Sequence, residues 1–134
     1  MVENKIVKIP LDGGKDLNVT FPIGARVSML MDAQTVGTRC LTENVTRVAP
    51  GVTLQPCHSH HDIEEIVYVV AGEGVIWVDG ETGKIKAGDS VLYPPNSKHT
   101  VKNTGTETLT LLCFFSNPNY RKDGAYSTHQ EVSF

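Results

Sequence analysis

Three histidines and nearby carboxylates are the residues of this chain whose types and spacing could do chemistry. His58 and His60 lie two positions apart in the segment 51–72, and His99 follows in the segment 88–103. Because successive side chains of a strand point to opposite faces, His58 and His60 are predicted to point to the same side. Imidazole and carboxylate groups are ligands of divalent first-row ions, so these residues predict a metal site on neighbouring strands.

The carboxylate of this site could come from Glu64 or Glu65, which follow the histidine pair. Glu65 is an odd number of residues from His60, so it joins the pair only if the chain turns or bulges between them. The expected place for this turn is His61–Asp62. His61 competes with His60 as a ligand, but strand alternation places His61 on the opposite face, where an exposed polar residue is expected.

The elements that must position these groups are predicted to be short strands. The alternation of apolar and polar residues and the spacing of turn residues predict strands at 5–9, 17–21, 25–31, 39–48, 52–60, 63–70, 75–78, 84–86, 90–93, 99–102 and 108–115. Turn residues separate them, as at Ala49–Gly51 and at Asp79–Gly80. A series of short strands with close turns predicts an all-β sandwich or barrel with little or no helix.

The two histidine-bearing segments resemble the two cupin motifs. The first is similar to G-x(5-6)-H-x-H-x(3-4)-E-x6-G, with matches at Gly51, His58, His60, Glu65 and Gly72. The second is similar to G-x5-P-x-G-x2-H-x3-N, with matches at Gly88, Pro94, His99 and Asn103. Asn96 stands where the family usually has glycine, and asparagine tolerates the left-handed backbone of such a position. The interval to Gly72 favours Glu65 over Glu64.

This resemblance implies a small antiparallel jelly-roll β-barrel with a metal near its mouth. It implies His58, His60, Glu65 and His99 as ligands of one divalent transition metal ion, with Fe, Mn, Ni, Co, Cu and Zn not distinguished. The expected function is a metal-dependent enzyme that acts on a small oxygenated or carboxylated metabolite, as a dioxygenase, isomerase, decarboxylase or lyase. The alternative is a non-catalytic small-molecule-binding module, so whether the chain is an enzyme stays open.

Three further residues are expected to line the substrate pocket. Tyr93 precedes a proline turn and Phe115 closes the last strand, although aromatic residues in strands more often belong to the core. Arg26, Arg39 and Arg47 could bind an anionic substrate in bidentate fashion, although surface charge is the commoner role for each of them alone. Of the three, Arg39 is the one expected to point inward, because Leu41 and Val45, on the same face of its strand, are apolar.

Chain length and net charge limit the expected number of domains and the expected partners. With 134 residues the chain is expected to form one domain, 1–134, with N-terminal strands or an arm at 1–35, a barrel core at 36–115 and a tail at 116–134 that packs or frays. His129 in this tail is expected to be exposed. The formal net charge of −3 gives no basic surface for nucleic acid.

Location and association follow from similar reasoning. No apolar run reaches the length of a membrane span. The three cysteines form no C-x-x-C pair, which predicts free thiols and a cytoplasmic location. The N-terminal strands have no obvious partner in a small barrel, and exposed strand edges tend to be covered. A homodimer that exchanges these strands, as the resemblance to small cupins implies, is therefore expected.

Overall fold

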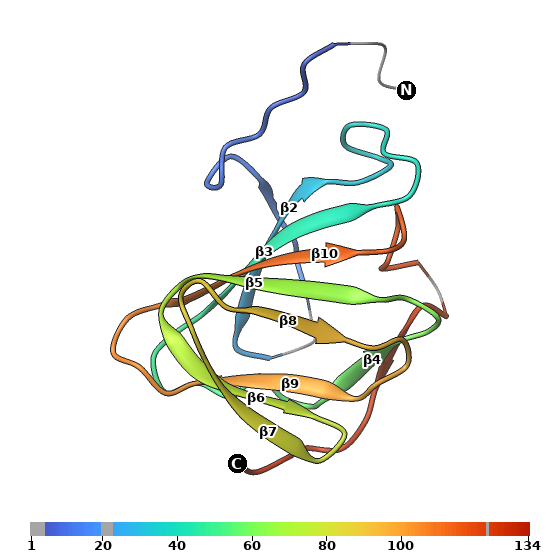
Figure 1. Cartoon of the computed structure of the whole chain (residues 1–134). Coiled ribbons are helices and arrows are strands. Elements are labelled where there is room, and N and C mark those ends of the chain that lie inside the picture. The colour runs from blue at the N-terminus through green and yellow to red at the C-terminus, as the bar shows by residue number, and fades with distance from the viewer. Residues whose placement is uncertain (1–4, 20–22, 123) are drawn as a thin grey trace.

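The computed structural model describes residues 5–19, 23–122 and 124–134. All secondary-structure elements in these residues are β-strands (Figure 1). The strands are β1 (Lys15–Asp16), β2 (Ala25–Met31), β3 (Thr42–Val48), β4 (His58–His60), β5 (Glu65–Ala71), β6 (Glu73–Val78), β7 (Glu81–Lys86), β8 (Ser90–Tyr93), β9 (His99–Asn103), β10 (Leu109–Phe115) and β11 (Tyr126–Thr128). None of the described residues belongs to a helix long and apolar enough to cross a membrane.

The strands form two antiparallel sheets. One has the order β1-β2-β3-β10-β5-β8, and the other has the order β11-β4-β9-β6-β7. Strands that are far apart in the chain, such as β3 and β10, are neighbours, as expected for a jelly roll. The prediction of an antiparallel all-β jelly roll is confirmed, although the two sheets remain separate and do not close into a continuous barrel.

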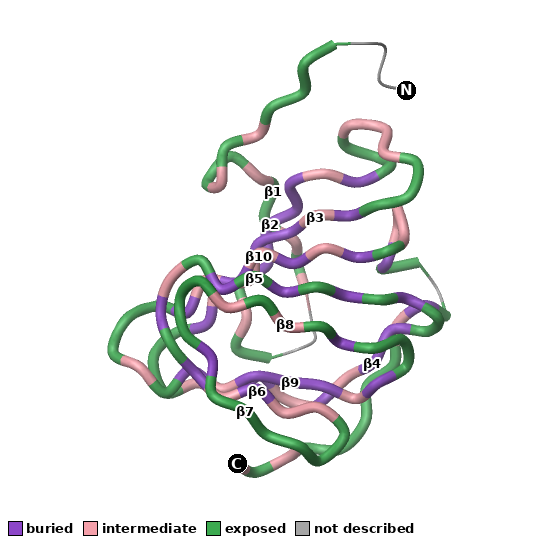
Figure 2. Tube along the Cα trace, in the orientation of Figure 1, coloured by how far each residue is buried: buried purple, intermediate pink, exposed green. Residues whose placement is uncertain are grey.

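The core lies between the two sheets, and β5 shows how the sequence builds it. Along β5 the residues at every second position, Glu65, Val67 and Val69, are buried, and those between them are exposed (Figure 2). The inward residues of β10, from Leu109 to Phe115, alternate in the same way. Period-two alternation therefore directs one face of each strand into the core and places Glu65 in line with apolar core residues.

Gly72, between β5 and β6, occupies a position that only glycine fits. Its φ angle is 90°, in the left-handed region. A Cβ atom at this position would lie 2.9 Å from the Leu109 Cα atom, closer than side chains approach. The sharp connection between β5 and β6 therefore requires the glycine of the first motif.

The N-terminal segment differs from its prediction. Residues 5–9 form no strand, and the predicted strand 17–21 is not observed at 17–19, while residues 20–22 lie outside the described part of the chain. The strands in the described part of the segment 1–35 are β1 and β2, and they pair with each other at Lys15↔Met29 and Asp16↔Ser28. The predicted strand 25–31 is observed as β2 and also pairs with β3, so the expectation that the N-terminal strands lack a partner is wrong for this strand.

The predicted strand 52–60 is shorter than expected. Only His58–His60 belong to a ladder, and Thr53 and Gln55 make isolated bridges. Pro56 has no amide hydrogen to donate, so it interrupts the ladder just before the histidine pair.

The C-terminal tail packs on the second sheet. β11 pairs with β4 in the register Tyr126↔His60 and Thr128↔His58, and the His61 amide donates to the Ala125 carbonyl at 3.0 Å. His129 is exposed, as predicted, and its Nε2 atom lies 2.8 Å from the Ser59 hydroxyl. The tail is therefore held along the strand that carries the histidine pair.

Candidate metal centre

The three predicted histidines meet on two adjacent strands. His58 and His60 lie on β4, and His99 begins β9, where it is the antiparallel partner of His58. One ring nitrogen atom from each of the three lies within 4.8 Å of those of the other two. His60 and His99 are buried and His58 is half-buried, so the cluster lies inside the molecule at one end of the second sheet.

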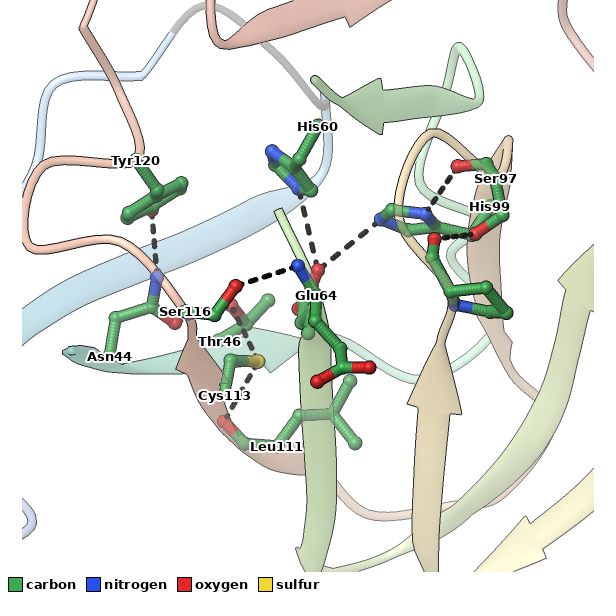
Figure 3. A network of polar contacts seen from close by, with 12 residues as sticks. Asn44, Thr46, His60, Glu64, Ser97, His99, Leu111, Cys113, Ser116 and Tyr120 are labelled. Atoms are coloured by element: carbon green, nitrogen blue, oxygen red, sulfur yellow. Dashed lines mark hydrogen bonds and ion pairs between the residues drawn. The ribbon is translucent and has the colours of Figure 1, made fainter. Parts of the chain in front are cut away.

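Glu65 reaches this cluster from the first sheet. Its Oε1 atom lies 3.4 Å from His60 Nε2 and 3.4 Å from His99 Nε2. In Figure 3 these two contacts are the dashed lines that leave the labelled His60 and His99 rings and meet at one oxygen atom, which belongs to the unlabelled Glu65 and not to the labelled Glu64. The alternative residues are excluded from this point, because Glu64 is exposed and the His61 side chain is 70% exposed.

A braced turn brings Glu65 next to His60. The chain turns at His61–Asp62, as predicted, and Asp62 takes a left-handed φ of 53°. Asn96, which replaces the family's glycine, also has a left-handed φ, of 67°. Its side-chain oxygen accepts from the Asp62 amide at 3.0 Å, and its side-chain nitrogen donates to the Asp62 carboxylate at 3.2 Å. The two motifs therefore hold each other through hydrogen bonds between their turns.

Several polar atoms at the centre are buried without a hydrogen-bond partner among the described residues. They are His58 Nδ1, His60 Nδ1, His60 Nε2, Glu65 Oε1 and His99 Nε2. Burying unpaired polar atoms is costly, and such groups usually have a protein, water or ion partner. A set of neutral imidazole nitrogen atoms and a carboxylate oxygen that face one another is a donor set suited to a divalent transition metal ion.

The orientation of His99 is set by two neighbours. Its Nδ1 atom lies 3.0 Å from the Ser97 carbonyl oxygen, which can only accept, so Nδ1 carries the proton. In the neutral ring this leaves the Nε2 lone pair directed at Glu65 and His60, as in metal-binding histidines. Tyr93 stacks on the ring, with centroids 3.9 Å apart and planes 13° apart. The tautomer and the ring plane are thus both determined by the fold.

The electrostatics of the cluster favour a neutral His58 ring and an ionised Glu65 carboxylate. Burial lowers the pKa of His58 well below its ordinary value, and the neighbouring His99 and His60 lower it further. For Glu65, burial by itself raises the pKa, but the His60 and His99 rings outweigh this effect and lower the pKa to about 2. At neutral pH the centre therefore offers lone pairs and one negative charge to a cation.

A cavity of about 60 Å³ adjoins the cluster. Tyr93 and Phe115 line it, together with His58, His60, His99 and Glu65, and the use of this cavity as a substrate pocket stays a prediction. Arg39 is a correction: it is exposed, it precedes β3, and it does not line this cavity. Of the two apolar residues on which the inward expectation for Arg39 rested, Leu41 is also exposed, whereas Val45 is fully buried.

The error arises because β3 begins only at Thr42, so the alternation of the strand does not extend to Arg39. The face of β3 that looks into the molecule carries Thr42, Asn44 and Thr46, of which the last two line the cavity. Asn44 donates to the Tyr120 hydroxyl at 2.7 Å (Figure 3). Polar residues of this strand therefore line the cavity, while Val45 on its other face is fully buried.

Sequence reasoning did not identify the residues that the tail adds to the cavity, nor Cys113 of β10. Tyr120, Arg121 and Tyr126 come from the tail, and Cys113 comes from β10. The aromatic residues scattered through the otherwise polar tail were the only local signal. All three cysteines are free, as predicted.

Comparison with known proteins identifies the family. Residues 44–115, more than half of the chain, match the family model described as cupin domain. The chain therefore belongs to the cupin domain family, and its histidine cluster is compatible with metal binding.

Individual relatives bear names connected with oxalate. The chain is 38% identical over 55 residues to an oxalate-binding protein of Thermotoga maritima, with 41% of this chain and 46% of that protein covered. It is 31% identical over 110 residues to an oxalate oxidase of Triticum aestivum, with 75% of this chain and 49% of that protein covered. The chain spans about half the length of the curated relatives it matches.

A solved structure has the same fold. It is the crystal structure of a predicted oxalate decarboxylase from Thermotoga maritima, with a TM-score of 0.71 and 22% identity over 83% of this chain and 99% of that one. At this identity the likeness concerns the fold, not the activity.

Proposed function

We propose that the chain binds one divalent transition metal ion through His58, His60, His99 and Glu65. The observation that carries this proposal is the group of buried nitrogen and oxygen atoms of the cluster that have no hydrogen-bond partner among the described residues, with one nitrogen atom of each ring within 4.8 Å of those of the other two. The chemistry of the donor set fits the ion, since three neutral imidazoles and a carboxylate suit Fe, Mn, Ni, Co, Cu or Zn. The pKa directions of His58 and Glu65 support the same arrangement.

We propose further that the chain is an enzyme acting on a small oxygenated or carboxylated metabolite, of the dioxygenase, isomerase, decarboxylase or lyase type. A bound divalent ion would supply Lewis-acid or redox chemistry. The protein groups hold the donor atoms in place: Ser97 orients His99, Tyr93 stacks on its ring, and the Asn96–Asp62 turn positions Glu65. The small cavity supports a small substrate, and the names of the oxalate oxidase and oxalate-binding relatives support a carboxylated one.

The second candidate function is binding without turnover. It is favoured by the name of the oxalate-binding relative. It is also favoured by the cavity wall, where the ionisable groups besides the proposed ligands are tyrosines, Cys113 and Arg121. Burial raises the pKa of Tyr93 and of Cys113 well above their ordinary values, so neither is poised to exchange protons near neutral pH.

The metal content of the protein tests the first proposal. We expect about one equivalent of a transition metal per chain after purification without chelator, measured by inductively coupled plasma mass spectrometry. The double variant His58→Ala/His99→Ala should lose it, because two donors are removed. His61→Ala is the matched control, since this histidine is adjacent in sequence but exposed. If the wild-type protein neither holds metal nor takes it up on dialysis, the proposed centre is wrong.

Turnover by the metal-loaded protein separates the two candidate functions. Small oxo acids, dicarboxylates and hydroxy acids are incubated with the loaded protein, and dioxygen uptake and product formation are followed. Conversion that is lost in the double histidine variant supports an enzyme. Saturable binding across the panel without conversion supports a binding module.

A further inference from the structure

The cavity has a permanent positive charge at its mouth. Among the described residues that line it, Arg121 is the one arginine or lysine. It is exposed and comes from the tail, at the end of the cavity that Tyr120 and Tyr126 also border. The histidine cluster and Glu65 line the same cavity. A cation and a proposed metal centre therefore share one small space.

Two tyrosines support the Arg121 side chain. The guanidinium carbon lies 5.8 Å from the centre of the Tyr120 ring and 5.9 Å from that of the Tyr126 ring, within the range of cation–π attraction. Tyr120 in turn stacks on Phe115 at 3.8 Å, and Tyr126 stacks on His58 at 5.2 Å. The Arg121 side chain is thus linked to the cavity wall through these two tyrosines. A guanidinium group that lies over an aromatic ring still has N–H donors along its own edge, and these can bind an anion.

A second observation at the mouth points independently to a ligand. The Tyr126 hydroxyl is buried and has no hydrogen-bond partner among the described residues. A phenolic hydroxyl can donate a hydrogen bond as well as accept one. An unpaired buried donor beside a guanidinium is a polar environment that an oxygen anion would complete.

The size of the cavity limits the class of ligand. Its volume of about 60 Å³ has room for roughly four to six water-sized groups. A planar carboxylate also matches the two parallel N–H donors of a guanidinium.

We propose that Arg121 and Tyr126 determine substrate specificity by binding one end of a small carboxylate anion whose other end faces the histidine cluster. This inference rests on the proposed metal centre and names the substrate class of that site. It assigns a binding role to a tail segment whose local sequence shows only scattered aromatic and charged residues.

Ligand titration of the cobalt-loaded protein tests this inference. Oxalate, acetate and the neutral acetamide are titrated by calorimetry and by the visible Co(II) spectrum. We expect the wild-type protein to bind carboxylates and not acetamide. Arg121→Gln should weaken carboxylate binding roughly tenfold to a hundredfold, since a charge-assisted hydrogen-bond pair is lost, with cobalt content unchanged. Tyr126→Phe, which removes only the hydroxyl, should weaken carboxylate binding several-fold.

Controls separate the possible outcomes. Arg26→Gln changes an arginine that pairs with Asp16 at 3.1 Å outside the cavity, and it should bind carboxylates as the wild type does. Equal carboxylate affinity in the wild type and in cobalt-loaded Arg121→Gln would overturn the role of Arg121. Equal affinity of the wild type for acetate and acetamide would overturn the anion assignment. A wild-type protein that takes up no cobalt would instead refute the metal centre, and this inference with it.

Discussion

At the scale of single residues, Asn96 links the two motifs through its backbone conformation and its side chain. A glycine at this position would supply the left-handed φ but no side-chain contact to the facing turn. Asn96 has the left-handed φ of 67° and also makes two hydrogen bonds to Asp62. Because Asp62 lies between His60 and Glu65, these bonds bear on the geometry of the proposed centre itself. The departure from the family pattern is thus compensated by a new interaction.

Substitution of Asn96 should separate the two contributions. We expect Asn96→Gly to lower the free energy of unfolding by about 1 kcal/mol, because the side-chain hydrogen bonds are lost and the unfolded chain gains freedom. Asn96→Ala should cost about 2 kcal/mol, because alanine is also strained at a left-handed φ. Urea unfolding followed by circular dichroism measures both. An alanine variant as stable as the glycine variant would contradict the role of the backbone conformation.

At the scale of elements, β5 and β11 contribute to the cavity in different ways. β5 begins with Glu65 in the proposed centre and continues with Val67 and Val69 in the core. Because these three side chains lie on the same face of one strand, the packing of the two valines also holds the Glu65 carboxylate in position. β11 is short and pairs only with β4, yet it places Tyr126 against His58. The first contribution depends on a local pattern and the second on a long-range pairing.

Two adjacent valines on β5 test the direction of this alternation. Val69 is fully buried, and Val70 is 36% exposed. We expect Val69→Ala to lower the free energy of unfolding by roughly 1.5–3 kcal/mol, because apolar burial is lost and a cavity remains. Val70→Ala should cost less than about 1 kcal/mol. Chemical denaturation of the pair provides the measurement, and equal losses would contradict the assignment of the two faces.

At the scale of the whole molecule, an apolar surface lies on the outer face of the first sheet. Exposed side chains of β5 and β8 form it, namely Ile66, Tyr68, Val70 and Leu92. Ile66 and Leu92 are direct partners across these two strands, so the surface is continuous. Apolar surfaces of this kind commonly mark association sites. Because β1 pairs with its own chain, this face is a better basis than strand exchange for the homodimer, which stays a proposal.

Charged substitutions on this face test the homodimer. We expect the wild type to have the mass of a dimer by light scattering, and Ile66→Lys/Leu92→Lys to have that of a monomer, because a twofold interface brings each new charge near its own copy. Ile6→Lys, on the exposed N-terminal segment, should leave the dimer intact. A monomeric Ile6→Lys protein would instead support exchange of the N-terminal segments, and a monomeric wild type would refute the homodimer.

The sequence by itself determined the all-β character and the residues that meet at the centre. His58 and His60 share a face because strands alternate with period two, and the turn at His61–Asp62 follows from the odd spacing to Glu65. These are local relations, so they can be derived from neighbouring residues. The second motif added His99 through its resemblance to the cupins.

Only the tertiary structure decided which residues complete the cavity. Arg39 was placed inward from the alternation of its predicted strand, but β3 begins only at Thr42, and Arg39 lies before it and is exposed. Arg121 and Tyr126 reach the cavity because β11 pairs with β4, two segments far apart in the chain. Such pairing depends on the packing of the whole molecule, and no local pattern in the tail specifies its partner.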